Sequence, residues 1–199
     1  NFMNLIDVSI VNVALPRIQA DTGATATQLE WVAVVYLLAL AVGPLPFGRF
    51  GDVFGRLRMF MWGLIGFTVA SVLCGFAPDI LTLIAARAAQ GIFAAMMVPQ
   101  VLAIVHVIFP PDEKARVFGL FGTISSLGVV AGPIIGGALI SAGFAGLGWR
   151  LAFLINIPLG IVALIGAMRF VPDLDTDITL RPDWIGTGLF AGAIVLLVL

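Results

Sequence analysis

The sequence predicts an all-α membrane protein, and three observations carry that prediction. First, 61% of the 199 residues are hydrophobic and only 11% are charged, whereas a soluble domain has roughly 25% charged residues. Second, the mean hydropathy is +1.14, so a water-soluble fold of this length could not bury its apolar surface. Third, the apolar runs exceed ten residues and do not alternate in polarity, which favours helices over the strands of a membrane barrel.

Six apolar runs follow one another along residues 1–170, and we expect them to form a six-helix domain. A helix that crosses the bilayer needs about 20 apolar residues, and single Gly or Pro residues within it are tolerated. The chain begins and ends inside apolar runs, so we expect it to be a fragment with a truncated first helix. The expected helices lie at 1–15, 31–47, 59–76, 80–109, 117–140 and 151–170, followed by a cytoplasmic loop at 171–183 and the start of a seventh helix at 184–199.

Basic residues in the connectors predict the orientation of these helices. Seven Lys and Arg residues fall on one side of the predicted bundle, and only Arg17 and Arg150 fall on the other. Connectors rich in Lys and Arg face the cytoplasm, so the N-terminus is predicted to be cytoplasmic. The net charge of −1 argues against a nucleic-acid partner. The seven residues are Arg49, Arg56, Arg58, Lys114, Arg116, Arg169 and Arg181.

Two charged residues, Asp7 and Arg87, lie deep inside apolar runs. Each would cost about 2.5–3.5 kcal/mol at the centre of a spanning helix, so neither is expected to face lipid. Asp7 precedes Arg17 by ten residues, about 15 Å of helix, and Arg87 follows Asp79 by eight, about 12 Å. The first and fourth helices therefore bring opposite charges to a similar depth. This predicts either a structural ion pair or a protonatable carboxylate beside a fixed positive charge.

Five further residues are candidates for a cavity near that pair. Gln90 and Gly91 share a helix face with the arginine, and Tyr36 could either line the same space or contact lipid. Met96 is expected to be a packing residue, although its flexible side chain could also adapt to varied ligands. Glu30 is expected at the outer interface, as a rim charge or as part of the cavity.

The segment 48–58 reads G-R-F-G-D-V-F-G-R-L-R, and we expect a tight turn in it. Its three glycines, Gly48, Gly51 and Gly55, permit sharp turns and close helix approach. Its charged residues Asp52, Arg56 and Arg58 could form a local network.

The segment 128–137 reads G-V-V-A-G-P-I-I-G-G. Gly128, Gly132 and Gly136 recur every four residues, which gives a face of small residues where helices can pack closely. Pro133 removes one helical hydrogen bond, and Gly137 adds a further small residue.

Taken together, these motifs resemble drug:proton antiporters of the major facilitator superfamily. Matching motifs occur in order: D-V-S-I-V-N-V-A-L-P at 7–16, the segment 48–58, R-A-A-Q-G at 87–91 and the glycine run at 128–137. Trp149 and the segment 156–160 resemble the beginning of that family's sixth helix. The sequence D-W-I-G at 183–186 resembles the seventh helix of the fourteen-span branch (EmrB/QacA type). Ser9, Phe50, Gly51 and Leu57 depart from the usual motif residues.

The resemblance implies the N-terminal half of a transporter, built from inverted 3+3 repeats and exporting drugs across the cell membrane. It implies that Asp7 exchanges the coupling protons and that Arg87 tunes this exchange. It further implies that the segment 48–58 latches conformations and that 128–137 acts as a hinge and seal. No cofactor other than the coupling proton is implied. The implied partners are small lipophilic substrates, cations among them, the bilayer and a C-terminal half.

Other functions are open on the sequence. The same machinery could export an endogenous amphiphile such as a siderophore, lipid or metabolite, or the protein could be an uncoupled facilitator. One His, one Cys and no paired catalytic residues argue against an enzyme. They also argue against a Cys/His metal site.

Overall fold

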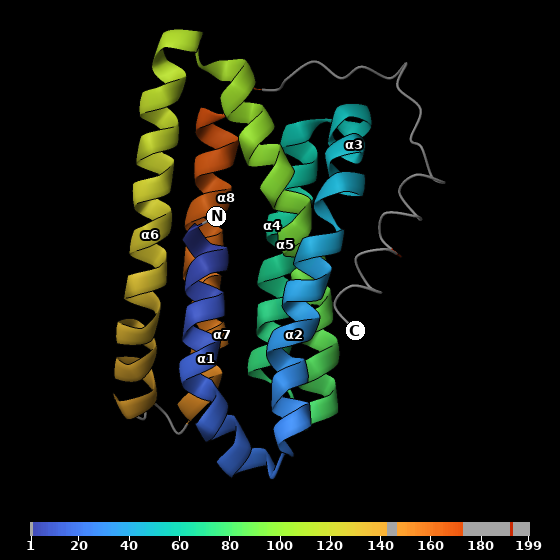
Figure 1. Ribbon diagram of the computed structural model, residues 1–199, viewed down its shortest axis with the longest axis vertical. Coiled ribbons are helices and arrows are strands. Elements are labelled where there is room, and N and C mark those ends of the chain that lie inside the picture. The colour runs from blue at the N-terminus through green and yellow to red at the C-terminus, as the bar shows by residue number, and fades with distance from the viewer. Residues whose placement is uncertain (1, 143–146, 173–191, 193–199) are drawn as a thin grey trace.

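A computed structural model describes residues 2–142, 147–172 and 192, and it shows an antiparallel helical bundle (Figure 1). The predicted all-α fold is confirmed. The predicted loop at 171–183 and the predicted seventh helix lie almost entirely outside the described residues. The elements are α1 (Phe2–Thr22), α2 (Ala26–Val42), α3 (Pro44–Phe54), α4 (Arg56–Gly75), α5 (Ile80–Ile108), α6 (Pro111–Ala142), the short 3₁₀ helix η2 (Gly148–Arg150), α7 (Leu151–Leu154) and α8 (Asn156–Phe170).

Four helical stretches in the described residues are long and apolar enough to cross a membrane: α4, α5, α6 and the stretch Gly148–Phe170. Helices α2 and α3 together would make a fifth, bent by 50° between them. Pro44 begins α3 and has no N–H to bond back to the preceding turn, which explains the break. Helix α1 lies beside the others but is less apolar, because it carries Asp7, Arg17 and Asp21.

The segment 48–58 is mainly helical, so the tight turn expected over it is confined to a single residue. Gly48 and Gly51 lie inside α3, and only Gly55 separates α3 from α4. Gly55 has a φ of 98°, a conformation that side chains other than glycine rarely adopt. Glycine is therefore required at the junction itself.

Two helices at the end of the bundle opposite α3 begin with side-chain caps. The Thr25 hydroxyl accepts the N–H of Gln28 at 3.3 Å, and the Gln28 side chain accepts the N–H of Thr25 at 2.9 Å. Asp79 accepts the N–H of Thr82 at 2.8 Å at the start of α5. This bond and a second from the Thr82 hydroxyl hold the pKa of the Asp79 carboxyl below its ordinary value.

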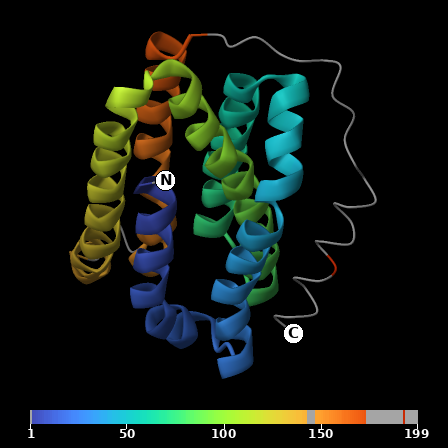
Figure 2. The ribbon, with the colours of Figure 1, turned by 45° about the horizontal axis from the view of Figure 1, so that its top comes forward.

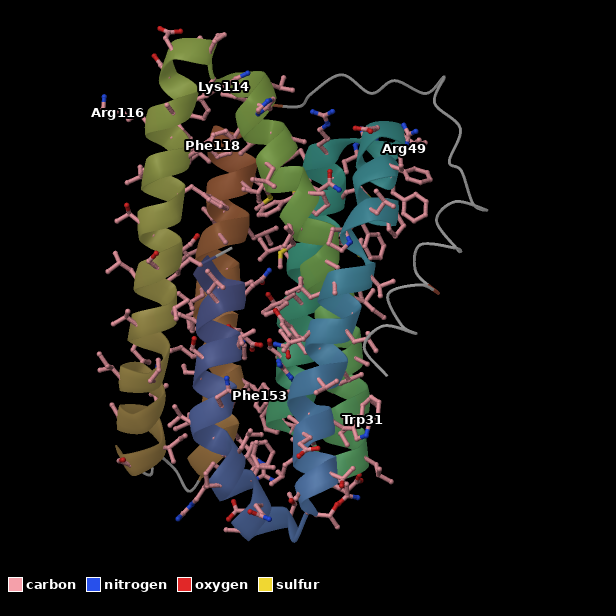
Figure 3. All side chains as sticks on the ribbon, in the orientation of Figure 1. Trp31, Arg49, Lys114, Arg116, Phe118 and Phe153 are labelled. Atoms are coloured by element: carbon pink, nitrogen blue, oxygen red, sulfur yellow. The ribbon has the colours of Figure 1, made fainter. Side chains whose placement is uncertain are left out.

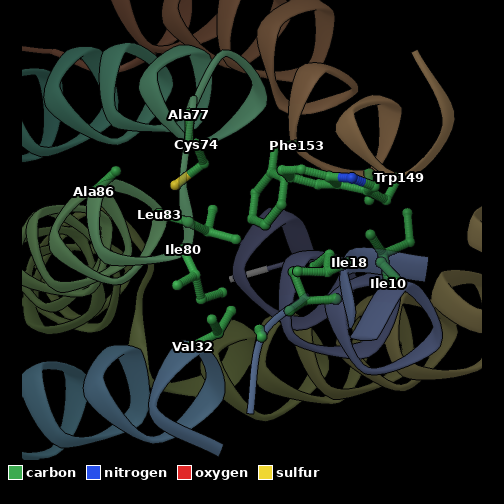
Figure 4. Close-up of a cluster of buried hydrophobic side chains, with 14 of the residues drawn as sticks. Ile10, Ile18, Val32, Cys74, Ala77, Ile80, Leu83, Ala86, Trp149 and Phe153 are labelled. Atoms are coloured by element: carbon green, nitrogen blue, oxygen red, sulfur yellow. The ribbon is translucent and has the colours of Figure 1, made fainter. Parts of the chain in front are cut away.

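Packing between the helices pairs the first predicted run with the fifth, and it places the third predicted run against the fourth and the sixth. Helix α1 packs on α6, α5 lies between α2 and α4, and α8 packs on α4 (Figures 1 and 2). Side chains from α1, α2, α4, α5 and α7 form one apolar cluster (Figure 4). Trp149 of η2 belongs to the same cluster and is fully buried.

Basic side chains gather at the end of the bundle where α3, the α5–α6 turn and the end of α8 meet. Arg49, Lys114 and Arg116 lie there, and Trp31 lies toward the opposite end (Figure 3). The charge asymmetry read from the sequence therefore corresponds to two physical ends of the described bundle.

Candidate functional site

An ion pair between α1 and α5 lies in the interior of the bundle. Arg87 Nη1 donates to Asp7 Oδ2 at 2.5 Å, although the two residues are 80 positions apart. Their side chains are 1% and 0% exposed. In the described part of the chain, no other charged side chain is buried. The structure thus brings together the two charges that the depth count placed at the same level.

Two amides complete the surroundings of the Asp7 carboxylate. Gln90 Nε2 donates to Asp7 Oδ1 at 2.9 Å, and Asn156 Nδ2 donates to the same oxygen at 2.8 Å. The Ser71 hydroxyl oxygen lies behind them and accepts from Gln90 at 2.6 Å and from Asn156 at 3.2 Å. The ionised carboxylate therefore has three donors, which offset the cost of removing it from water.

Two hydrogen bonds and two aromatic rings also hold the Arg87 side chain in place. Its Nε donates to the carbonyl of Val32 at 3.1 Å, and its Nη1 donates to Gln90 Oε1 at 2.7 Å. Its guanidinium carbon lies 4.1 Å from the centre of the Tyr36 ring and 5.8 Å from that of Phe153. These faces attract the cation, so the positive charge is held in place when the carboxylate changes.

Gly91 allows α2 to approach Arg87 closely. A Cβ at this position would lie 2.6 Å from the Tyr36 carbonyl oxygen and 2.9 Å from Ala39 Cβ. A larger residue would push α2 away and remove both the Tyr36 ring and the Val32 carbonyl from the arginine. Gln90, Gly91 and Tyr36 are thus all part of the site.

The glycine face of α6 lies directly against α1. A Cβ at Gly132 would collide with Ser9, and one at Gly136 would lie 2.9 Å from Ile10 Cγ1. Gly128 approaches Phe2 in the same way, with its Cβ position 3.0 Å from Phe2 Cδ2. This face sets the position of the helix that carries Asp7.

The remaining two motif residues of α6 do not contribute to that contact. Gly137 has no neighbouring atom within 4 Å of its Cβ position. Pro133 is exposed, and α6 continues through it as one helix.

A second charged pair lies at the α3–α4 junction. Arg56 Nη2 lies 3.0 Å from Asp52 Oδ1, with the side chains 30% and 28% exposed. Arg56 Nη1 also donates to the Ala103 carbonyl of α5 at 3.4 Å. Arg58 is exposed and is not brought into this pair. A cavity of about 430 Å³ adjoins the pair, lined among others by Gly48, Arg49, Pro99 and Gln100.

Two predicted cavity residues lie outside the buried site. Glu30 is exposed near the start of α2. Met96 is buried between α5 and α4, where its Cβ lies 3.1 Å from the Cβ position of Gly63. The packing alternative therefore describes Met96 in this structure.

Three functional candidates were missed from the sequence: Asn156, Ser71 and Gln100. Gln100 Nε2 donates to the Phe47 carbonyl at 2.6 Å, and its side chain fills the space that a Cβ at Gly51 would take. This explains why position 51, which departs from the usual motif residue, is a glycine. All three are neutral polar residues inside apolar runs, and that is the signal that could have identified them.

Sequence relatives extend over nearly the whole chain. The probable actinorhodin transporter of Streptomyces coelicolor is 43% identical over 198 residues, which is 98% of this chain and 34% of the relative. The puromycin resistance protein pur8 of Streptomyces alboniger is 40% identical over 195 residues, 98% of this chain and 38% of the relative. The chain thus spans little more than a third of the length of these relatives.

Solved structures share the fold. A bacterial homolog of the human lysosomal transporter Spinster, in an inward-facing and occupied conformation, matches with a TM-score of 0.69 at 24% identity. The match covers 88% of this chain and 43% of that one. The sequence profile of the Major Facilitator Superfamily matches residues 1–198. This chain therefore belongs to the Major Facilitator Superfamily.

Proposed function

We propose that the chain forms the N-terminal half of a proton-coupled drug exporter, in which Asp7 carries the coupling proton. The observation that supports this proposal is the buried carboxylate of Asp7 with a fixed arginine and two amides around it. Ionisable residues inside membrane helices are costly and commonly serve ion or proton transfer. The exposed acidic residues of the described chain have no comparable surroundings.

Coupling follows from the charge balance at this site. With Asp7 ionised, the pair is neutral and holds α1 to α5. With Asp7 protonated, Arg87 is left with an uncompensated charge, so a different helix arrangement becomes more favourable. A cationic substrate is repelled by the net positive charge of the protonated pair and not by the neutral ionised pair, so it binds preferentially after the proton has left and one proton is exchanged for one substrate molecule.

The relatives support export as the direction of transport. One relative is named as a tetracenomycin C resistance and export protein, and another is named as a puromycin resistance protein. Small lipophilic compounds are therefore the proposed substrates. The Lys and Arg residues of the connectors at this end of the bundle support a cytoplasmic position for the α3–α4 junction. The motif at 183–186 supports the fourteen-span branch.

Drug-induced proton release from the purified full-length transporter tests the proposal. We expect lipophilic cations to release protons from the wild type and not from Asp7→Asn, which cannot ionise. Asp21→Asn is the matched control, because Asp21 is an exposed acid on the same helix. Normal release from a well-folded Asp7→Asn protein would contradict the proposal. Wild-type transport without any proton release would instead indicate an uncoupled facilitator.

A further inference from the structure

The two amides that contact Asp7 Oδ1 differ in what their own oxygens do. Gln90 Oε1 accepts from Arg87 Nη1 at 2.7 Å and lies 3.7 Å from the Cys74 sulfur, which donates to it. Asn156 Oδ1 is buried and has no hydrogen-bond partner. A buried carbonyl oxygen without a partner is costly. No contact in the ionised site compensates for the unpartnered oxygen of Asn156.

Protonation of Asp7 supplies a reason. A proton on Oδ1 turns this atom into a donor, and a donor facing an amide NH₂ group has no acceptor. Gln90 cannot turn its amide over, because its NH₂ group would then face the guanidinium of Arg87, which only donates. Asn156 can turn over without losing any bond at its own oxygen, and the terminal torsion of asparagine is soft.

We infer that Asn156 is a positioning residue for the coupling proton and that its amide turns over when Asp7 is protonated. In this step a proton adds to Asp7 Oδ1 and forms an O–H bond. The hydrogen bond from Asn156 Nδ2 to Oδ1 breaks, and the new Asp7 O–H donates to Asn156 Oδ1. This inference rests on the proposed function, because it requires Asp7 to take up the proton.

Ser71 can keep its hydrogen bond with Asn156 before and after the amide turns over. Its hydroxyl oxygen now accepts from Asn156 Nδ2 at 3.2 Å. After the amide turns, the same hydroxyl donates to Asn156 Oδ1, since a hydroxyl is both donor and acceptor. In either state, Asn156 thus makes one hydrogen bond with Asp7 and one with Ser71. The Asn156 atom without a partner is Oδ1 before the turnover and Nδ2 after it.

The turnover links α1 to the beginning of α8. Apart from Arg87 on α5, the titratable groups that face the pair are Tyr36 from α2 and Cys74 from α4. Helix α6 faces α1 with glycines, and α8 contributes the neutral Asn156. Protonation of Asp7 therefore reaches α8 through the hydrogen bond between Asp7 and Asn156.

The pH profile of drug-induced proton release in the full-length transporter tests this role, using Asn156→Leu. Leucine has a similar shape but neither donates nor accepts. The ionised carboxylate loses a charge-assisted bond and the protonated acid loses a weaker neutral one. We therefore expect release to persist to a pH about one unit higher, a tenfold change in proton concentration. Asn4→Leu is the matched control: Asn4 is a second buried asparagine, it lies on α1, and its amide makes no hydrogen bond to Asp7.

A second variant and a second background keep a folding defect apart from the proposed role. Asn156→Ala also lacks the amide and should shift the profile in the same direction. In an Asp7→Asn background, Asn156→Leu should leave the pH dependence of drug binding unchanged, because no proton remains to be sensed. An unshifted profile in both variants, while Asp7→Asn alone abolishes release, would overturn the role of Asn156 and leave the proposed function standing. Normal release from Asp7→Asn would overturn both.

Discussion

Two aspartate–arginine pairs in this bundle have opposite surroundings. Asp7 and Arg87 are 0% and 1% exposed and join helices from distant parts of the sequence. Asp52 and Arg56 are 28% and 30% exposed and lie four residues apart at a helix junction. Water can replace a lost partner at the exposed pair but not at the buried one. Only the buried pair can therefore convert a change of protonation into a change of helix packing.

The two pairs also differ in what surrounds them. Around Asp7, amides from α5 and α8 supply donors to an oxygen that Arg87 leaves unused. Around Asp52, the neighbouring groups are the arginine itself and an open cavity, while Arg56 reaches the Ala103 carbonyl of α5. The buried pair is thus part of a closed network, whereas the partly exposed pair joins α3 to α4 and its arginine contacts α5.

Breaking the buried pair should have the largest effect. Arg87→Ala leaves the Asp7 carboxylate buried without its partner, which costs about 3–5 kcal/mol. We expect loss of transport and a large fall in the thermal unfolding temperature of the full-length protein. Arg116→Ala, at an exposed arginine outside both charged pairs, should change neither.

The apolar double variant Asp7→Leu/Arg87→Met then separates structure from function. It should recover thermal stability, because no charge remains buried. It should not recover proton release. Recovery of both would mean that the pair is only structural.

Gly132→Leu should have the next largest effect, through the helix that carries Asp7. The new side chain would collide with Ser9 and push α1 from α6. We expect transport to be lost while the protein still inserts, measured by export and by the amount of protein in membranes. Gly122→Leu is the control on the same helix, because nothing lies within 4 Å of its Cβ position. Equal export by the two variants would contradict a packing role for the glycine face.

Breaking the exposed pair should have the smallest effect. Asp52→Asn removes an ion pair whose side chains are 28% and 30% exposed, and ion pairs that water can reach contribute about 0–1 kcal/mol. We expect a small fall in unfolding temperature that disappears in high salt, since salt screens exposed charges. A fall as large as that of Arg87→Ala, unaffected by salt, would remove the distinction between the two pairs.

Much of the fold could be predicted from the sequence, because long apolar runs dictate membrane helices. The helix breaks were harder to place. The segment 48–58 looked like a turn because of its glycines, but α3 continues to Phe54 and only Gly55 needs a positive φ. Three glycines are compatible with either structure, and the packing of Gln100 against Gly51 decides in favour of the helix.

The charged part of the site was also predictable, and the neutral part was not. Counting residues from the helix ends gave Asp7 and Arg87 similar depths, and burial requires opposite charges to meet. Asn156 and Ser71 carry no charge, so neither has to pair with a specific residue. Their contact with Asp7 depends on how α4 and α8 are rotated, which the sequence pattern does not determine.

Infrared difference spectroscopy of the full-length transporter tests most directly whether Asp7 carries the coupling proton. Protonated carboxylic acids absorb apart from carboxylates, so a drug that displaces the proton should remove the carbonyl band of a protonated acid. We expect this loss in the wild type and in Asp21→Asn, and we expect no such signal in Asp7→Asn. A drug-induced loss of the same size in a well-folded Asp7→Asn protein would show that another acid carries the proton.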